Sequence, residues 1–229
     1  MEPGLHLQRV SHASLPSMEC DTLTKLPYHS LIGCLLYLAI GTCLDISFAV
    51  QQLSQFLDCY SHLHWHTATH IVRYLKGTRH LHLCLGGNQT NLLGFTDSDW
   101  ANCPDMQHSV GGYVFLLGSG VISWTTKKQK AVTASSCEAE YITGFEAAKE
   151  AIWLCSLLSG ISMLTPMPTM ILCDNNATID LSDDPLLHAH VKHIDIKYHF
   201  LQERVQSREF AMTYTVTPKT LSILTPNVV

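Results

Sequence analysis

Hydrophobic and polar residues follow a helical pattern in the first third of the chain. Apolar residues recur every three or four positions between residues 30 and 57, which predicts two helices that separate near Gly41. A third helix is predicted over residues 64–75, and Gly77 is well placed to cap its C-terminus. Residues 1–26 are polar, contain prolines and show no sustained period, so this lead is expected to be poorly ordered.

Beyond residue 80 the pattern changes from helical to strand-like. Short runs of β-branched, aromatic and other apolar residues are bounded by turn residues, as in β-strands. A short strand is predicted at 80–85, and the further strands are residues 92–97, 110–118, 121–126, 169–174 and 210–216. The sequence Gly118-Ser119-Gly120 is expected to join two of these strands as a hairpin.

Helices are predicted between the later strands. Ser135 and Glu138 have the spacing of a capping box, which predicts the start of a helix. Further helical stretches are expected at 175–182 and 191–206. From residue 92 onwards the order is three strands, a helix, a strand, one or two helices and a strand. The long connection between the third and the fourth strand implies a right-handed crossover onto a parallel neighbouring strand. We therefore predict an α/β fold with a mixed five-stranded sheet and flanking helices.

The composition indicates a folded protein but says little about its partner. The 229 residues are 46% hydrophobic, enough for a sizeable core, and their formal net charge is −5. This charge argues against a strongly basic nucleic-acid binder, although local basic patches remain compatible with it. Nine cysteines occur singly without a CxxC pair, as in reduced, intracellular proteins.

We expect the chain to be cytoplasmic or nuclear, and neither secreted nor bound to a membrane. Its N-terminus lacks the basic-then-apolar run of a secretory signal. Its longest apolar stretch, residues 31–41, is too short to span a bilayer and is interrupted by glycine.

Three carboxylates are candidates for a common site. Asp97 and Asp174 each end a predicted strand, and Glu140 lies in the first turn of the intervening helix. Sites in open α/β sheets form at such strand ends, although aspartates there can also be simple turn residues. Three converging carboxylates imply bound divalent cations, and hard oxygen ligands favour Mg²⁺ or Mn²⁺ over zinc. Two such ions can activate water for phosphodiester cleavage.

Other candidates have simpler interpretations. Asp99 is expected to lie past its strand end, and Glu138 is explained by helix capping. His66 and His70 have the spacing of a helical zinc pair but no completing ligand, which favours a polar helix face. Cys137 is expected to be structural rather than a nucleophile.

A lysine cluster and two tryptophans follow or precede predicted strands. Lys127, Lys128 and Lys130 could contact a nucleic-acid backbone or could form a solvated turn, and both interpretations stay open. Trp100 and Trp124 are expected in the core of the sheet rather than as stacking platforms.

Five sequence motifs resemble, in order and at similar separations, the ribonuclease H domain of copia-type LTR retrotransposons. They are GFTDSDWA, HSVGGYVFLLGSGVISWTTKKQ, SSCEAEYI, ILCDNNATI and VKHIDIKYHFLQERV. Upstream, PYHSLIGCLLYLAIGTCLDISFAVQQLSQF and HWHTATHIVRYLKGT resemble the C-terminal part of the reverse transcriptase of the same elements. Together these motifs cover nearly all of residues 27–217.

The resemblance implies a domain organisation and a function. Residues 27–88 would be a helical remnant of the reverse transcriptase thumb or connection, and residues 90–229 a ribonuclease H-like domain. The implied activity is endonucleolytic cleavage of RNA in RNA/DNA hybrids with two Mg²⁺ or Mn²⁺ ions. The family motifs assign metal binding and catalysis to Asp97, Glu140 and Asp174 in this sequence.

The C-terminal tail departs from the family pattern. A segment resembling VPTKEQLADILTKP usually supplies a fourth carboxylate, whereas VTPKTLSILTPNVV places Ser222 at that position. Asp195 is a poor substitute, because its surroundings resemble scaffold. The alternative to an enzyme is therefore a non-catalytic, decayed or domesticated nucleic-acid-binding remnant.

Two further activities are not expected. The paired aspartates of a polymerase palm are not recognisable, since Asp183 and Asp184 precede a proline in a predicted loop, so polymerase activity is expected to be absent. A transposase or integrase would be expected to place its glutamate on a later helix, whereas Glu140 precedes Asp174.

Overall fold

The chain forms two compact units. The computed structural model describes residues 7–10, 17–87, 90–99, 108–130, 132–133, 135–163, 166–183 and 195–215. The first unit extends to His82 and the second begins at Leu83. No helix in these described ranges is long and apolar enough to cross a membrane.

The first unit is helical. Its elements are α1 (Ser17–Thr24), α2 (Tyr28–Gly41), the 3-10 helix η2 (Leu44–Ile46), α3 (Ser47–Ser54) and α4 (His62–Gly77). Ile32 and Leu35 of α2 and Val50 and Leu53 of α3 are buried in its core, whereas Leu38 of α2 is exposed. The predicted helical segment before the sheet is therefore confirmed.

Three local predictions in the first 87 residues were wrong. Helix α1 lies within the lead that we expected to be poorly ordered, because Leu23 is fully buried and Tyr60 donates a hydrogen bond of 3.0 Å to its carbonyl. Gly77 is the last residue of α4 and not its cap, since Thr78 bonds to the Tyr74 carbonyl instead. Residues 80–85 form no strand apart from a single bridge residue, Leu83. Their polar–apolar alternation finds no partner over its length.

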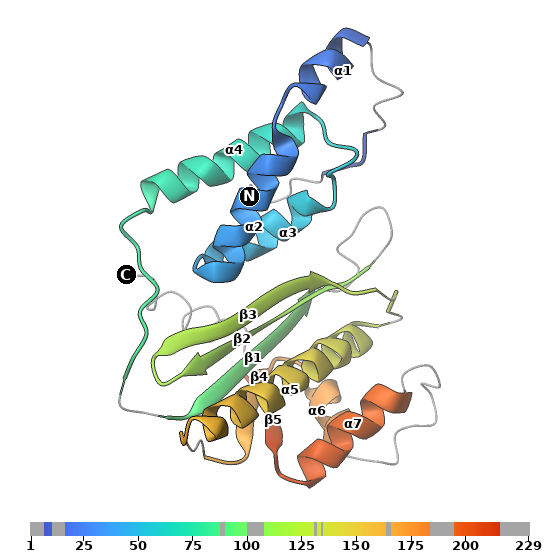
Figure 1. Cartoon of the computed structure of the whole chain (residues 1–229). Coiled ribbons are helices and arrows are strands. Elements are labelled where there is room, and N and C mark those ends of the chain that lie inside the picture. Colours follow the sequence, from blue (N-terminus) through green and yellow to red (C-terminus); the bar gives the residue numbers. More distant parts are fainter. Residues whose placement is uncertain are drawn as a thin grey trace. The chain divides into compact units, whose positions relative to one another are not determined.

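The second unit is built on a mixed five-stranded sheet (Figure 1). Its strands are β1 (Leu92–Asp99), β2 (Val110–Leu117), β3 (Gly120–Lys128), β4 (Thr169–Cys173) and β5 (Phe210–Tyr214). The order is β3-β2-β1-β4-β5. Strands β1 to β3 are antiparallel, whereas β4 runs parallel to β1 and β5 parallel to β4. This topology confirms the predicted α/β fold with a mixed five-stranded sheet.

Helix α5 (Ser136–Gly160) runs along one face of the sheet, with α6 (Asn176–Asp183) and α7 (Asp195–Gln206) beside it (Figure 1). The predicted cap is present, because Ser135 Oγ accepts a hydrogen bond of 3.1 Å from the Glu138 backbone N–H. Small residues on the buried side of α5 allow it to approach the strands closely. They are Ala147, Ala148 and Ala151, which share a core with Phe115, Ile171 and Phe210.

Two glycines of β2 and its turn have backbone roles. Gly118 has a φ of 63° in the predicted hairpin between β2 and β3. Gly111 lies where α5 crosses β2, and a Cβ atom there would stand 2.1 Å from Thr143 Oγ1. Thr143 cannot easily move away, because its hydroxyl donates to the Ala139 carbonyl and accepts from Gln129 Nε2.

We predict that Gly111→Ala lowers the free energy of unfolding by about 1–3 kcal/mol, the usual cost of overpacking. Urea unfolding followed by circular dichroism measures this change. Gly160→Ala is the matched control, because Gly160 ends the same helix α5 and a Cβ atom added there would meet nothing within 4 Å. Equal stability of the Gly111 and Gly160 variants would contradict the close approach of α5 to β2.

Candidate active site

Asp97 lies on β1, and Asp174 is the first residue after the neighbouring parallel strand β4, which ends one residue earlier than predicted. Phe95 pairs with Leu172, and continuing this register by two residues brings Asp97 opposite Asp174. Strand β1 extends past Asp97 to Asp99, because its hairpin with β2 continues on the other side. We had predicted Asp97 as the last residue of its strand, and this prediction was wrong. Asp97 lies instead where β1 passes beyond the end of β4.

Glu140 reaches the same edge of the sheet from α5. It is the fifth residue of the helix, slightly later than the first turn that the sequence indicated. Its Oε1 atom accepts a hydrogen bond of 2.9 Å from the backbone N–H of Ser98. Because Ser98 directly follows Asp97, this bond ties the helix to the strand beside the first carboxylate.

The three predicted carboxylates are brought together. One oxygen each of Asp97, Glu140 and Asp174 lie within 4.8 Å of one another. Glu140 is only 5% exposed, Asp174 is half-buried and Asp97 is exposed. The Oε2 atom of Glu140 is buried and finds no hydrogen-bond donor in the described part of the chain. A buried anionic oxygen without a donor is costly, so this atom is a suitable ligand for a cation.

Burial and mutual repulsion raise the pKa values of the cluster. The pKa of Glu140 is raised to about 8 by burial first, and then by the negative charges of Asp97 and Asp174. The pKa of Asp97 is also raised, by desolvation of its carboxylate and then by the charge of Asp174, although part of the side chain remains open to solvent. Without a cation, the cluster therefore retains a proton at neutral pH.

Neighbouring polar residues hold the segment around Asp174 in place. Asn175 caps α6 through a hydrogen bond of 3.1 Å from the Thr178 backbone N–H to its Oδ1 atom. The Thr178 hydroxyl bonds to the Cys137 carbonyl, which links α6 to the start of α5. Our predictions missed Asn175, although an asparagine before a helical pattern is a recognised capping signal.

Cys137 fits its predicted structural role. It is half-buried, and its Sγ atom lies 3.8 Å from Thr178 Oγ1. Burial raises the pKa of the thiol, so it is not poised as a thiolate nucleophile.

The remaining candidates are not members of the cluster. Asp99 is the last residue of β1, so it does not lie past the strand end as predicted, and it is not one of the three grouped carboxylates. Glu138 lies in the first turn of α5, at the capping position. His66 and His70 are both exposed on α4. Trp124 is half-buried in β3 rather than fully in the core.

Several predicted positions lie outside the described residues or at their edge. Ser222, Trp100 and Asp184 are outside them. Asp195 is the first residue of α7, and Asp183 is the last residue of α6 rather than part of a loop.

Similarity to known proteins identifies the family. The chain is 40% identical over 201 residues to the retrovirus-related Pol polyprotein from transposon TNT 1-94 of Nicotiana tabacum. The matched region covers 85% of this chain and 15% of that protein. It is 38% identical over 210 residues to the retrovirus-related Pol polyprotein from transposon RE2 of Arabidopsis thaliana, covering 90% of this chain and 14% of that protein. The chain belongs to the retrovirus-related Pol polyproteins of transposons. No family model matches it.

This Pol polyprotein chain spans about 15% of the length of the tobacco relative. Among solved structures it is similar to a foamy viral protease-reverse transcriptase determined in complex with an RNA/DNA hybrid. That likeness has a TM-score of 0.51 and 14% identity, and it covers 89% of this chain and 27% of the viral protein. At this identity the comparison shows a shared fold.

We predict that metal-free protein loses stability as the pH rises from about 5 to 8. Glu140 releases its proton at a pH of about 8 in the folded protein but near its ordinary value of 4.5 when unfolded. The unfolded chain therefore binds fewer protons in this range, and the free energy of unfolding falls, by an amount on the order of 3 kcal/mol. Glu140→Gln, which keeps an acceptor for Ser98, should remove most of this decline.

Urea unfolding in EDTA at several pH values measures this effect. Glu138→Gln is the control, because it removes a carboxylate from the same helix but leaves Glu140 in place. A constant difference between parent and Glu140→Gln across the pH range would refute the raised pKa.

Proposed function

We propose that residues 90–229 carry a ribonuclease H-type activity, the endonucleolytic cleavage of RNA in RNA/DNA hybrids. The main support is the cluster of Asp97, Glu140 and Asp174, with its buried and unpartnered Glu140 oxygen. The Pol family and the likeness to a viral protein complexed with an RNA/DNA hybrid also support the proposal. We further propose that the element is of the copia type and that residues 27–88 derive from the thumb or connection of its reverse transcriptase.

The residues of the cluster fit divalent cations. All three side chains offer oxygen ligands, which Mg²⁺ and Mn²⁺ prefer, and the oxygens are close enough to share ions. Asp97, Glu140 and Asp174 would hold two such ions. When bound, the ions supply an activated water and stabilise the leaving oxygen of phosphodiester hydrolysis.

A backbone group beside the cluster orients Glu140 for cation binding. The Ser98 N–H donates to one oxygen of Glu140, and the other oxygen is left to bind a cation. The proton that Glu140 retains below its pKa of about 8 must leave when a cation binds, so cation affinity should increase with pH. The hybrid would be selected by its shape and by contacts to ribose hydroxyls rather than by base sequence.

A second candidate is a nucleic-acid-binding remnant without catalysis. The sequence of the tail favours it, since Ser222 occupies the position of the family's fourth carboxylate. A serine hydroxyl is a weaker ligand for a hard cation than a carboxylate. The two candidates differ in whether a bound hybrid is cut.

We predict that the full chain cuts the RNA strand of a labelled RNA/DNA hybrid in Mg²⁺ or Mn²⁺, and that Asp97→Asn lowers the rate by at least about 100-fold. The loss follows because an amide cannot supply the anionic ligand that two divalent ions require. Gel analysis of the cleaved strand measures the rate.

Asp99→Asn is the matched control, because Asp99 lies on the same strand but outside the grouped carboxylates. It should cut at close to the parent rate. Binding of the hybrid without any cleavage by the parent would leave the non-catalytic remnant as the function. Recovery of cleavage in Ser222→Asp would then identify the tail as the defect.

A further inference from the structure

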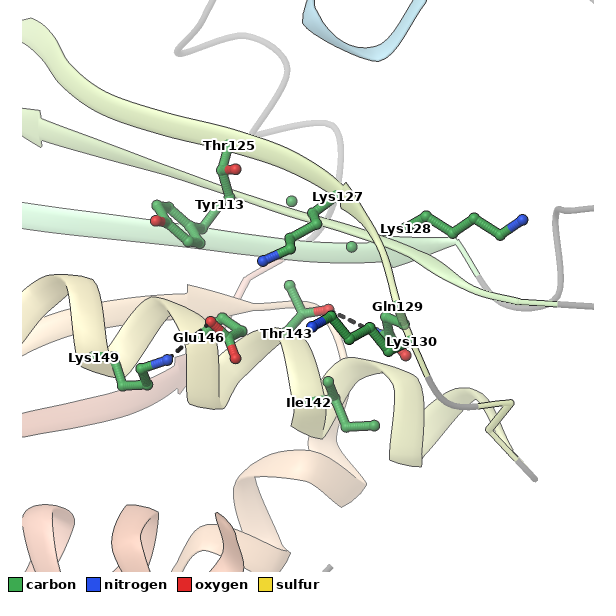
Figure 2. A pocket seen from close by; sticks show the side chains of 12 residues that line it. Tyr113, Thr125, Lys127, Lys128, Gln129, Lys130, Ile142, Thr143, Glu146 and Lys149 are labelled. Carbon is green, nitrogen blue, oxygen red and sulfur yellow. Dashed lines mark hydrogen bonds and ion pairs between the residues drawn. The ribbon is translucent and has the colours of Figure 1, made fainter. Parts of the chain in front are cut away.

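A basic pocket lies between β3 and α5, separate from the three carboxylates. It has a volume of about 430 Å³, which is within the range of small-ligand sites, about 300–1,000 Å³. Gly111 and Gly112 of β2 line it, together with lysines of β3 and of the loop that follows (Figure 2).

Two lysines converge on this pocket. Figure 2 shows the amino groups of Lys127 and Lys130 directed into the space between β3 and α5. Lys128 also borders the pocket, but its amino group points away from it in the same view. Because side chains alternate along a strand, Lys127 and Lys128 necessarily face opposite sides.

The charge of the pocket is positive. Its one carboxylate, Glu146, forms an ion pair of 3.2 Å with Lys149 on the same helix. Neither Lys127 nor Lys130 forms an ion pair with a carboxylate of the described residues. Two ammonium groups are therefore left to attract an anion, on a chain whose formal net charge is −5.

The lysine segment is fixed to the helix by a buried glutamine. The Nε2 atom of Gln129 donates to the Ala139 carbonyl at 2.8 Å and to Thr143 Oγ1 at 3.1 Å. Gln129 is only 8% exposed. These bonds hold the backbone between Lys127 and Lys130 against α5, which restricts where the two amino groups can lie.

The pocket adjoins the carboxylate cluster. Gly112 pairs with Asp97 across the β1–β2 hairpin, and adjacent strands lie about 4.8 Å apart. Thr143 follows Glu140 by nearly one turn of α5, a rise of about 4.5 Å. A nucleic-acid strand carries one phosphate about every 3.4 Å of helix axis, so a strand that reaches the carboxylates can also present a phosphate to the lysines.

We propose that Lys127 and Lys130 form a phosphate-binding pocket that holds the backbone of the nucleic acid beside the carboxylate cluster. This proposal rests on the proposed hybrid-binding function, and it adds a specific anchor that the cluster itself cannot provide. Ammonium groups bind phosphates through charge-assisted hydrogen bonds, and each such contact makes the affinity salt-dependent.

The test is hybrid binding by the full chain in EDTA, where no cleavage occurs, measured by fluorescence anisotropy over a range of salt concentrations. Replacing both Lys127→Gln and Lys130→Gln should reduce the slope of log Kd against log salt by about 2, roughly 1 per phosphate contact. Lys128→Gln is the matched control and should leave the slope close to that of the parent. Circular dichroism verifies that all variants are folded.

Several results would overturn the proposal. The first is that the parent does not bind the hybrid. The second is that the double variant has the same salt slope as the parent. The third is an equal fall of the slope in Lys128→Gln, which would indicate a diffuse positive potential rather than a pocket. Calorimetry with inorganic phosphate forms a second arm. If phosphate binding depends on the two lysines but the salt slope of hybrid binding is the same in the double variant, the pocket binds a free anion. This result would also overturn the proposal.

Separate cleavage measurements in Mg²⁺ distinguish this proposal from the catalytic one. If the parent cuts the hybrid but the salt slope does not depend on the lysines, only the phosphate-pocket proposal is refuted. A protein with the expected slopes that never cuts refutes the catalytic function alone.

Discussion

Repulsion among three carboxylates is the constraint on which the sheet-containing unit depends. Two charges about 5 Å apart repel by on the order of 3 kcal/mol at an effective dielectric constant of about 20. Folding nevertheless brings Asp97, Glu140 and Asp174 together, and it buries the glutamate. The cost is visible in the pKa of Glu140, which burial first, and then the charges of the two aspartates, raise to about 8. Such an arrangement costs stability unless a cation neutralises it, which is why we propose it as a site for divalent cations.

The surrounding fold is organised to keep the repelling groups in place. The parallel register of β1 and β4 holds two of them side by side, and the Ser98 backbone N–H holds the third. Close packing of α5 on β2 at Gly111 sets the position of the helix that carries Glu140. The same packing creates the neighbouring lysine pocket, because Thr143 and Gln129 join the end of β3 to that helix. The carboxylates and the lysine pocket therefore both depend on how α5 packs on the sheet.

Much of this unit could be predicted from the sequence because its signals are local. The apolar runs of the strands and the Ser135 cap predicted the sheet and the long helix, and the motif resemblance pointed to the three carboxylates. Features that depend on tertiary contacts could not be predicted in this way. The hydrogen bond from Ser98 to Glu140 is donated by the backbone, so no residue type in the sequence indicates it. The hydrogen bond from the Gln129 side chain depends on a contact with Ala139 of α5, ten residues further along the chain.

The wrong predictions have the same origin. Residues 80–85 alternate as a strand would, but no neighbouring strand pairs with them along their length. Helix α1 has little periodicity, and it is stabilised instead by burial of Leu23. In both places, packing against the rest of the unit decided the structure and the local pattern did not.

Crystals of the full chain grown with Mn²⁺ would test the cation site most directly, through an anomalous difference map. We predict a Mn²⁺ peak in contact with the carboxylate oxygens of Asp97, Glu140 and Asp174, including the buried Oε2 of Glu140. Well-ordered carboxylates at these positions without a Mn²⁺ peak between them would contradict a divalent-cation site.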